Sequence, residues 1–492
     1  MTAAADHGGL AYRSPVGRWV LLATVLGSGI AFLDTTVVNV ALPTIGQDLD
    51  AGIASLQWVV NAYTLTLSGF LLLGGSLGDH YGRRRVFVLG VIWFAGASLL
   101  CGLAPTDEAL IAARALQGIG GALLTPGSLA IIEASFRRED RGPAIGAWSG
   151  LGGVTAAVGP FLGGWLVQAA SWRLIFLINL PLAAVVVWVS VRHVPESRDP
   201  GATGRLDWAG AALAAAGLAG VVYALTDGPG QGWTSPRILL TGGIGVAALV
   251  AFLAWERRTA APMLPLDLFA SRQFSAANLV TFVVYGALSG SLFLMPIQLQ
   301  RVVGYSPLAS GVALVPITVV LLLLSARAGR LASRIGPRLP MTLGPLGVAA
   351  GFALFTRIGP GASYLVDILP ASLIYGLGLV LTVAPLTSTV LAAAPAEHAG
   401  IASAVNNDVA RTAGLLAVAV LPVAAGISGA GALEPARFAG GFRTAMTIAA
   451  VLCAAGGVLS WLTIRNPEPE PSEGDHPMSC PLSAPSPAAR RS

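Results

Sequence analysis

Long apolar stretches recur along the whole chain, separated by short segments that hold most of the charged residues. A helix needs roughly 20 apolar residues to cross a bilayer, and fourteen stretches are about that long. The pattern predicts an all-α polytopic membrane protein with 14 transmembrane helices. The predicted spans lie near residues 18–42, 56–77, 86–104, 109–132, 143–167, 174–191, 208–226, 237–255, 274–299, 308–326, 340–357, 364–391, 400–427 and 443–464.

The composition agrees with this pattern and excludes an ordinary soluble enzyme. Of the 492 residues, 54% are hydrophobic and 11% are charged, whereas soluble domains carry about 25% charged residues. The first stretch follows Arg13 and Arg18 and resembles a signal peptide, but it continues past Leu33 with no small-residue cleavage site at its end. We therefore expect it to remain as the first transmembrane helix.

The basic residues predict the orientation. All 29 are Arg, and cytoplasmic loops carry the excess of positive charge in membrane proteins. A cytoplasmic N-terminus places 21 Arg on inner segments and 6 on outer ones. We therefore predict a multi-pass protein of the cell inner (plasma) membrane with both termini cytoplasmic. The net charge of +5 follows from this topology and does not indicate nucleic-acid binding. The inner set is Arg13, Arg18, Arg83–Arg85, Arg137, Arg138, Arg141, Arg192, Arg198, Arg205, Arg257, Arg258, Arg272, Arg327, Arg330, Arg334, Arg338, Arg465, Arg490 and Arg491, and the outer set is Arg173, Arg237, Arg301, Arg357, Arg437 and Arg443.

Missing residue types exclude further functions. The chain has no Lys, so it cannot contain the GxxxxGK[ST] loop with which ATP-driven pumps bind phosphate. It has only five His and three scattered Cys, with neither an HExxH sequence nor a paired-His metal site. We predict no enzyme activity, no cofactor and no metal ion. A membrane enzyme or a receptor is a weaker alternative, since the sequence offers no set of site residues for either.

Two similar segments predict an internal repeat. Gly, Leu, Gly and a terminal Arg recur at matching offsets in residues 75–85, after the second span, and 329–338, after the tenth. We expect both segments to be loops in two six-helix halves related by an axis along the membrane normal. The predicted division is an N-terminal cytoplasmic tail (1–17), a six-helix bundle (18–193), a linker with two extra transmembrane helices (194–273), a second six-helix bundle (274–464) and a disordered cytoplasmic tail (465–492).

Four sequence patterns, in order on the expected spans, resemble those of one family. Over residues 18–464 the chain resembles the major facilitator superfamily, and within it the fourteen-span drug:proton antiporters. It departs from the family pattern at His80, where Arg is usual, and at Asp408, where the pattern is often uncharged. The patterns resemble the signature loop of the superfamily (Gly75–Arg85), the signature of the fourteen-span group (Leu33–Pro43), the motif of proton-coupled carriers (Leu110–Gly121) and the antiporter motif (Gly159–Gly164).

Asp34 and Arg114 are the candidates for proton coupling. Asp34 is the only acid deep in the apolar spans of the first half, about 24 Å from Arg18 at 1.5 Å per residue. A carboxyl group inside the membrane is a functional-site hypothesis by default, and Arg114 in the fourth span is the matching cation. A structural acid, or a fixed ion pair joining the two spans, is the alternative. The resemblance implies that Asp34 carries the proton.

Two further groups are assigned by the resemblance. Glycines in the first signature segment permit a tight turn, and the family uses this segment as a conformational latch; a basic loop that only sets topology is the alternative. Glycine and proline in the fifth span remove side chains from one face and interrupt its hydrogen bonds. The family uses this motif for antiport, and plain helix packing is the alternative. The predicted gating residues are Asp79, Gly82, Arg83 and Arg84, and the antiporter motif is Gly159, Pro160, Gly163 and Gly164.

Polar and aromatic residues on the spans expected to face the centre are possible substrate contacts. Aromatic faces can hold a cation, although Trp and Tyr also form belts at the membrane interface. Asp408 and Arg411 are three residues apart, so they share a helix face and can pair. The possible cavity residues are Asn39, Trp58, Asn61, Tyr63, Gln117, Tyr285, Gln298, Asn406, Asp408 and Arg411.

Together these features predict a proton-coupled exporter of drugs, antibiotics or other lipophilic small molecules, which works by alternating access. The alternative is a facilitator or symporter for a small metabolite; a facilitator would continue to transport after collapse of the proton gradient. The expected partners are the lipid bilayer, protons and the substrate. We expect no nucleic-acid partner and a monomeric state.

Overall fold

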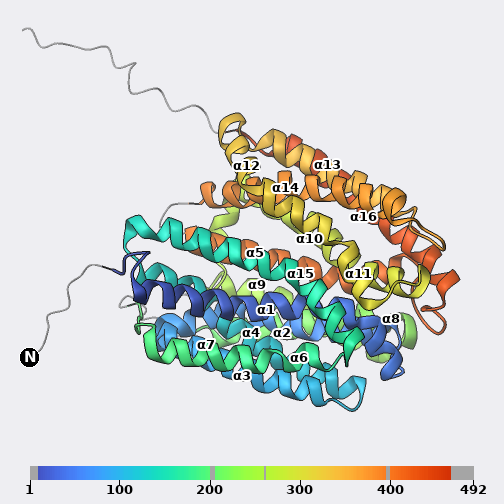
Figure 1. Ribbon diagram of the computed structural model, residues 1–492, viewed down its shortest axis with the longest axis horizontal. Coiled ribbons are helices and arrows are strands. Elements are labelled where there is room, and N and C mark those ends of the chain that lie inside the picture. Colours follow the sequence, from blue (N-terminus) through green and yellow to red (C-terminus); the bar gives the residue numbers. More distant parts are fainter. Residues whose placement is uncertain (1–8, 200–205, 260–261, 395–398, 467–492) are drawn as a thin grey trace, which may run out of the picture.

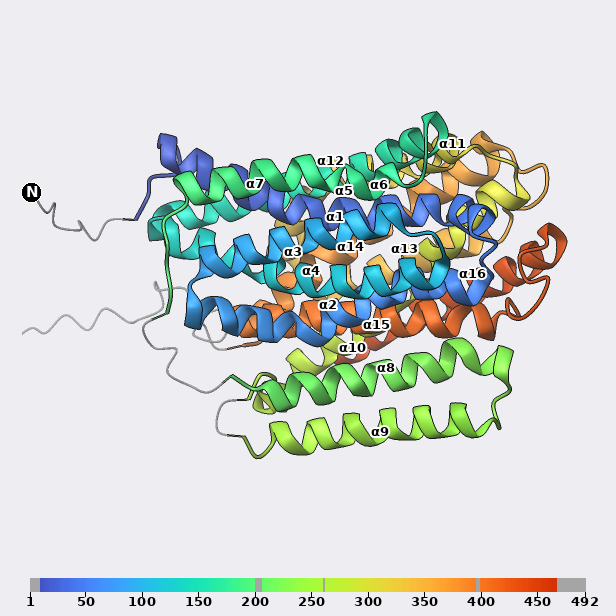
Figure 2. The same ribbon diagram turned by 90° about the horizontal axis from the view of Figure 1, so that it is seen from below.

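The computed structural model describes residues 9–199, 206–259, 262–394 and 399–466. Within these ranges it contains 14 helices long and apolar enough to cross a membrane, which confirms the predicted all-α membrane fold (Figures 1 and 2). Residues 1–8 of the predicted N-terminal tail and residues 467–492 of the predicted C-terminal tail lie outside the described residues.

Most spans are single helices, and the others consist of two consecutive segments. The single helices are α1 (Pro15–Asp48), α2 (Ile53–Tyr81), α3 (Arg83–Leu103), α4 (Asp107–Ser135), α5 (Arg138–Ala169), α8 (Trp208–Gln231), α9 (Pro236–Glu256), α13 (Arg338–Phe355), α15 (Ala399–Ala424) and α16 (Pro435–Thr463). The two-segment spans are α6 (Leu174–Leu177) with α7 (Asn179–His193), α10 (Arg272–Ile297) with η2 (Gln298–Val302), α11 (Pro307–Ala313) with α12 (Val315–Ile335), and η3 (Tyr364–Ile368) with α14 (Leu369–Ala392), and η1 (Leu266–Ala270) precedes α10.

Many helices extend beyond the apolar stretches that predicted them. α1 continues to Asp48, whose carboxylate accepts hydrogen bonds from Trp172 Nε1 and Arg173 Nη1, both at 2.8 Å. Hydrogen bonds from Trp172 and Arg173 therefore support the last turn of α1. α12 likewise continues to Ile335. As a result Arg327, Arg330 and Arg334, which the hydropathy pattern places after the span, lie in the helix.

The first bundle (α1–α7) and the second bundle (α10–α16) pack by the same scheme. In the first, α1 contacts α4, α5 and α7, α2 contacts α3 and α4, and α3 contacts α4 and α7. In the second, α10 contacts α14, α15 and α16, α12 contacts α13 and α14, and α13 contacts α14 and α16. Each helix of one bundle thus has a counterpart with the same neighbours in the other, as expected for a repeated unit.

The two signature segments occupy matching positions, but they are not the loops that we expected. α2 continues to Tyr81 and α3 begins at Arg83, so Gly82 alone forms the turn at a φ of 108°. Gly336 occupies the equivalent place between α12 and α13 at a φ of 83°. The glycine backbone lies in each case against a side chain from beyond the sixth span of its own bundle, Glu196 or Asn466.

Replacing either turn glycine with alanine should destabilise the protein. A positive φ costs a residue with a Cβ about 1–3 kcal/mol, and a Cβ on Gly82 would stand 2.7 Å from Glu196 Oε1. We expect Gly82→Ala and Gly336→Ala each to lower the thermal unfolding midpoint in detergent. Gly96→Ala is the control, because Gly96 lies in α3 with no atom within 4 Å of its Cβ position. Equal midpoints for all three variants would contradict this account.

The remaining pair, α8 and α9, packs along the side of the bundles (Figure 2). α8 contacts α9, and it also contacts α2 of the first bundle and α15 of the second. α9 lies on the far side of α8, and most of its side chains are outside the protein core. α8 is therefore the member of the pair that contacts both bundles.

The two bundles touch each other at the end where α1 ends and α2 begins, which we call the closed end. Gln57 Nε2 at the start of α2 donates to the Val418 carbonyl in the second bundle at 2.7 Å. Gln300 Nε2 in η2 donates to the Val40 carbonyl near the end of α1 at 2.9 Å. Figure 1 shows α11 beside the last turns of α5. These contacts hold the first and second bundles together at the closed end.

At the opposite end, where α1 begins, the first turns of α5 carry an exposed glycine face, and we call this the open end. Gly142, Gly146 and Gly150 recur every four residues and therefore share one helix face. No atom lies within 4 Å of a Cβ position on any of them. α5 thus contacts α11 near its end, at Gly164, and has one face without close neighbours along its first turns.

Candidate transport site

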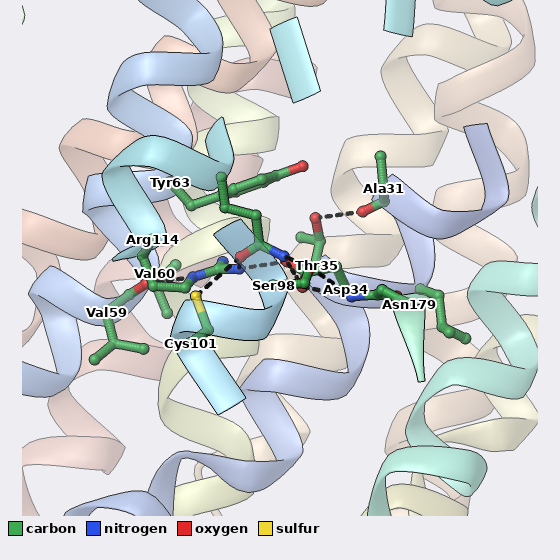
Figure 3. Close-up of polar contacts among 12 residues, drawn as sticks. Ala31, Asp34, Thr35, Val59, Val60, Tyr63, Ser98, Cys101, Arg114 and Asn179 are labelled. Carbon is green, nitrogen blue, oxygen red and sulfur yellow. Dashed lines mark hydrogen bonds and ion pairs between the residues drawn. The ribbon is translucent and has the colours of Figure 1, made fainter. Parts of the chain in front are cut away.

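Asp34 lies in the middle of α1 and is 1% exposed. Its carboxylate forms an ion pair with Arg114 of α4, in which Arg114 Nη1 donates to Asp34 Oδ2. Gln117 Nε2 donates to the other oxygen, Oδ1, at 2.8 Å. The sequence predicted that an acid and an arginine would meet here, and Figure 3 shows them in contact between α1 and α4. This set of donors suits a charged carboxylate.

Arg114 has further partners that do not depend on Asp34. Its Nε donates to the Val59 carbonyl of α2 at 3.0 Å, and its Nη1 donates to Gln117 Oε1 at 2.6 Å. The guanidinium carbon also lies 4.4 Å from the centre of the Tyr63 ring, within the range of a cation–π interaction. The cation would therefore stay in place if the carboxylate of Asp34 lost its charge.

A second layer of polar side chains, Ser98 of α3 and Asn179 of α7, surrounds the pair. Ser98 Oγ accepts from Gln117 Nε2 at 2.8 Å and from Asn179 Nδ2 at 3.2 Å. Asn179 Nδ2 also reaches Asp34 Oδ1 at 3.5 Å. Neither Ser98 nor Asn179 was predicted as a site residue. Both are fully buried, and a polar residue within an apolar stretch is the signal that could have identified them.

Two side chains of α1 beside the buried pair lie outside the packed core of the first bundle. Thr35 is exposed and Asn39 is half-buried, although α1 packs against α4, α5 and α7 of its own bundle and α10 of the other. Asn39 Nδ2 donates only to the Thr35 carbonyl of its own helix. The exposed Thr35 is thus one residue from Asp34, while Asp34 itself faces the interior of the first bundle.

The antiporter motif lies where α5 meets α1 and the second bundle. A Cβ on Gly159 would stand 2.0 Å from Thr36 Oγ1, and one on Gly163 would stand 2.7 Å from Val37 Cγ1. These two glycines let α5 approach α1 next to Asp34. The other two motif residues, Pro160 and Gly164, face α11.

The contact of α5 with α11 leaves no room for side chains. A Cβ on Gly164 would stand 2.6 Å from the Pro307 carbonyl oxygen. A Cβ on Gly311 of α11 would stand 2.2 Å from the Pro160 carbonyl oxygen. Glycine on both helices thus permits backbone-to-backbone contact at the closed end, as small residues do at helix interfaces in membranes.

The predicted gating residues bond within the first bundle and the segment that follows it. Asp79 Oδ1 accepts from Arg83 Nε at 2.8 Å. Arg84 Nη1 donates to the Val194 carbonyl at 3.0 Å, and its backbone N–H donates to Glu196 Oε1 at 3.1 Å. Glu196 was not predicted as a gating residue. The one feature of the sequence that could have suggested it is an acid shortly after the sixth span, on the same side of the membrane as the signature segment.

Several possible cavity residues have structural partners. Trp58 Nε1 donates to Asp227 of α8, and Gln298 Nε2 donates to the Ile358 carbonyl of its own bundle. Asn406 Nδ2 donates to Asn278 Oδ1 and Thr281 Oγ1 on α10. Of the predicted set, the structure places Gln117 and Tyr63 at the Asp34–Arg114 pair and does not place Trp58, Gln298 or Asn406 there.

Asp408 and Arg411 do not form the ion pair that their spacing allows. Both are half-buried on α15, and the described residues contain no hydrogen bond or ion pair to either of them. Tyr285 is half-buried on α10, and the amide of fully buried Asn61 lacks a partner among the described residues. One carboxylate oxygen of Asp408, Oδ1, is itself buried without a hydrogen-bond partner among the described residues.

The sequence has close relatives among resistance proteins. It is 37% identical to the puromycin resistance protein pur8 of Streptomyces alboniger, over 91% of each chain. It is 36% identical to the methylenomycin A resistance protein of Bacillus subtilis (strain 168), over 83% of this chain and 88% of the relative. It is also 36% identical to the multidrug resistance protein Stp of Mycobacterium tuberculosis, over 78% of this chain and 71% of the relative. The names of these relatives support an efflux transporter.

Solved structures of transporters share the fold. The crystal structure of an inward-facing bacterial homologue of the human lysosomal transporter Spinster aligns with a TM-score of 0.67 and 18% identity, over 92% of this chain and 97% of that chain. The crystal structure of a D-xylose–proton symporter aligns with a TM-score of 0.65 and 15% identity, over 91% of this chain and 98% of that chain. These likenesses show that the chain shares the fold of these proteins. The family profile described as Major Facilitator Superfamily matches residues 24–419, so the chain belongs to the major facilitator superfamily.

Proposed function

We propose that this protein is a proton-driven antiporter that exports antibiotics or other lipophilic small molecules, with Asp34 as the proton carrier. One observation carries the proposal: a buried carboxylate, paired with Arg114, lies one residue from the space between the bundles. Charged groups inside a membrane are costly and mark ion pathways. The names of the resistance relatives support the cargo class.

The arginine distribution supports cytoplasmic termini, so we assign the open end to the cytoplasm and the closed end to the outside. The structure then corresponds to the inward-open state. Asp34 is charged here and is held by Arg114 and Gln117. In an antiport cycle this is the state reached after the proton has left for the cytoplasm, ready to receive cargo.

The cycle follows from the partners of Asp34. Cargo enters from the open end, the bundles close around it, and the closed end separates. A proton from outside then binds the Asp34 carboxylate, which weakens the ion pair with Arg114. Arg114 stays in place on Gln117 Oε1, the Val59 carbonyl and the Tyr63 ring. The neutral Asp34 permits the return to the inward-open state, and the proton leaves on the cytoplasmic side.

Asp408 and Arg411 are proposed to contact the cargo. They lie on α15, which borders the space between the bundles, and they lack partners among the described residues. An unpaired carboxylate and an unpaired guanidinium can each bind a charged or polar group of a small molecule. Asn39 and Tyr285 complete this proposed surface on the facing helices α1 and α10.

Transport in inside-out membrane vesicles tests the proposal. We expect vesicles that contain the protein to take up ethidium or puromycin when their interior is acidified. A protonophore should lower this uptake to the level of vesicles without the protein, because the proton gradient is the driving force. Vesicles with a dissipated gradient that still transport at the original rate would exclude proton coupling and favour a facilitator.

A further inference from the structure

α8 is attached to the first bundle by polar and close backbone contacts. Trp58 Nε1 of α2 donates to Asp227 Oδ2 of α8 at 2.8 Å. The Trp58 and Tyr223 rings lie 6.2 Å apart. Further along, a Cβ on Gly69 of α2 would stand 2.9 Å from Ala215 Cβ of α8. α8 is therefore held to α2 both near its end and near its middle.

The contact of α8 with the second bundle is of a different kind. Leu218 and Val222 of α8 pack with Leu415 and Ala419 of α15 in one apolar cluster. No hydrogen bond or ion pair joins α8 to α15 among the residues that the structure describes. α15 thus presents an apolar surface to α8. No polar contact among the described residues fixes the position of α15 along α8.

The two contacts differ in what it costs to break them inside a membrane. Lipid tails are as apolar as leucine, so an apolar contact between helices can be exchanged for lipid at little cost. Separating Asp227 from Trp58 would remove the donor of Oδ2 and leave only the longer bond from Gln231 Nε2 to Oδ1 at 3.4 Å. Hydrogen bonds to a charged group are roughly twice as strong as neutral ones. The α2 contact should therefore persist while the α15 contact changes.

We propose that α8 and α9 move with the first bundle as one body, and that α15 slides along α8 during each transport cycle. α8 then covers the line where α2 meets α15 in both states and keeps lipid out of that side of the transporter. This inference rests on the alternating-access mechanism proposed above. It assigns a role to the two additional helices and explains why Trp58 faces α8 instead of the cargo.

Two cross-links test this assignment. In a variant whose native cysteines have been replaced, we would introduce the pairs Gly69→Cys with Ala215→Cys, and Val222→Cys with Ala419→Cys. A short bifunctional thiol reagent then joins α8 to α2 in the first variant and α8 to α15 in the second. Ethidium uptake by inside-out vesicles is measured before and after linkage. The unlinked form of each variant is its own control.

We expect the α8–α2 link to leave uptake unchanged and the α8–α15 link to reduce it at least tenfold. The reverse result would mean that α8 moves with the second bundle, and loss of uptake in both would mean that it moves against both bundles. Unchanged uptake in both would mean that α15 does not slide along α8. Each of these three results would overturn the proposal.

A distance measurement keeps the proposal testable if the protein exports neither probe. Spin labels are placed at the exposed positions Trp208 of α8, Leu89 of α3 and Leu462 of α16. Between acidic and alkaline conditions, we expect the Trp208–Leu89 distance to stay constant and the Trp208–Leu462 distance to change. A constant Trp208–Leu462 distance with a changing Trp208–Leu89 distance would reject the attachment of α8 to the first bundle, whatever the fate of the export hypothesis.

Discussion

Asp34→Asn should abolish gradient-driven export and leave a folded but less stable protein. The amide cannot carry the proton, so uptake by inside-out vesicles should fall to the level of vesicles without the protein. Breaking one side of a buried ion pair leaves the other charge uncompensated, which costs about 3–5 kcal/mol of stability. Arg114 keeps its bonds to Val59 and Gln117, so the variant should still reach the membrane with a lowered unfolding midpoint.

The double variant Asp34→Asn with Arg114→Gln separates the two effects. It removes both buried charges, so its unfolding midpoint should recover toward the native value while transport stays absent. If Asp34→Asn, expressed at native levels, still accumulated drug against a gradient, Asp34 would not be the proton carrier. If the double variant were no more stable than the single one, the assigned cost of the unpaired Arg114 would be wrong.

Gly311→Val should stop transport by preventing the closed end from forming. Its Cβ would meet the backbone of Pro160, with 2.2 Å to the carbonyl oxygen, and a backbone atom cannot rotate away. We expect at least a tenfold loss of uptake and a shift toward the outward-open state. A cysteine at Thr35, next to Asp34, should then react faster with a membrane-impermeant maleimide added from outside.

Gly96→Val in α3 is the matched control for this substitution. Gly96 is exposed on its helix and has no atom within 4 Å of its Cβ position. It should therefore tolerate the same side chain with near-native uptake and unchanged labelling of the Thr35 cysteine. Native uptake by Gly311→Val would show that the α5–α11 contact can move apart without cost, and it would remove this contact from the gating mechanism.

The helices and the central pair could be predicted because their signals are local. Apolar length alone identifies each span, and the acid and the arginine at positions 34 and 114 stand out inside such spans as candidates to pair. The repeat of glycine and arginine placed Gly82 and Gly336 at equivalent points. It did not reveal that the surrounding residues are helical, because the helices extend past the apolar stretch that hydropathy detects and are supported there by contacts such as those of Asp48.

The other residues of the site could not be predicted, because their contacts depend on which helices become neighbours. Ser98 and Asn179 lie in spans far apart in sequence, and only the packing of α3 against α7 brings them to Gln117. Trp58 was assigned to the cavity because its span borders the centre, but the side chain points to α8. The direction in which a side chain points depends on which helices pack against its own helix. A single sequence does not identify those neighbouring helices.

The contacts that hold the closed end have main-chain acceptors. Gln57 donates to the Val418 carbonyl, which has no partner four residues later because Pro422 lacks an N–H. Gln300 donates likewise to the Val40 carbonyl. A carbonyl oxygen is present whatever side chain its residue carries. Substitutions at Val40 or Val418 therefore leave both acceptors in place, so the hydrogen bonds of the closed end do not depend on which side chains these two positions carry.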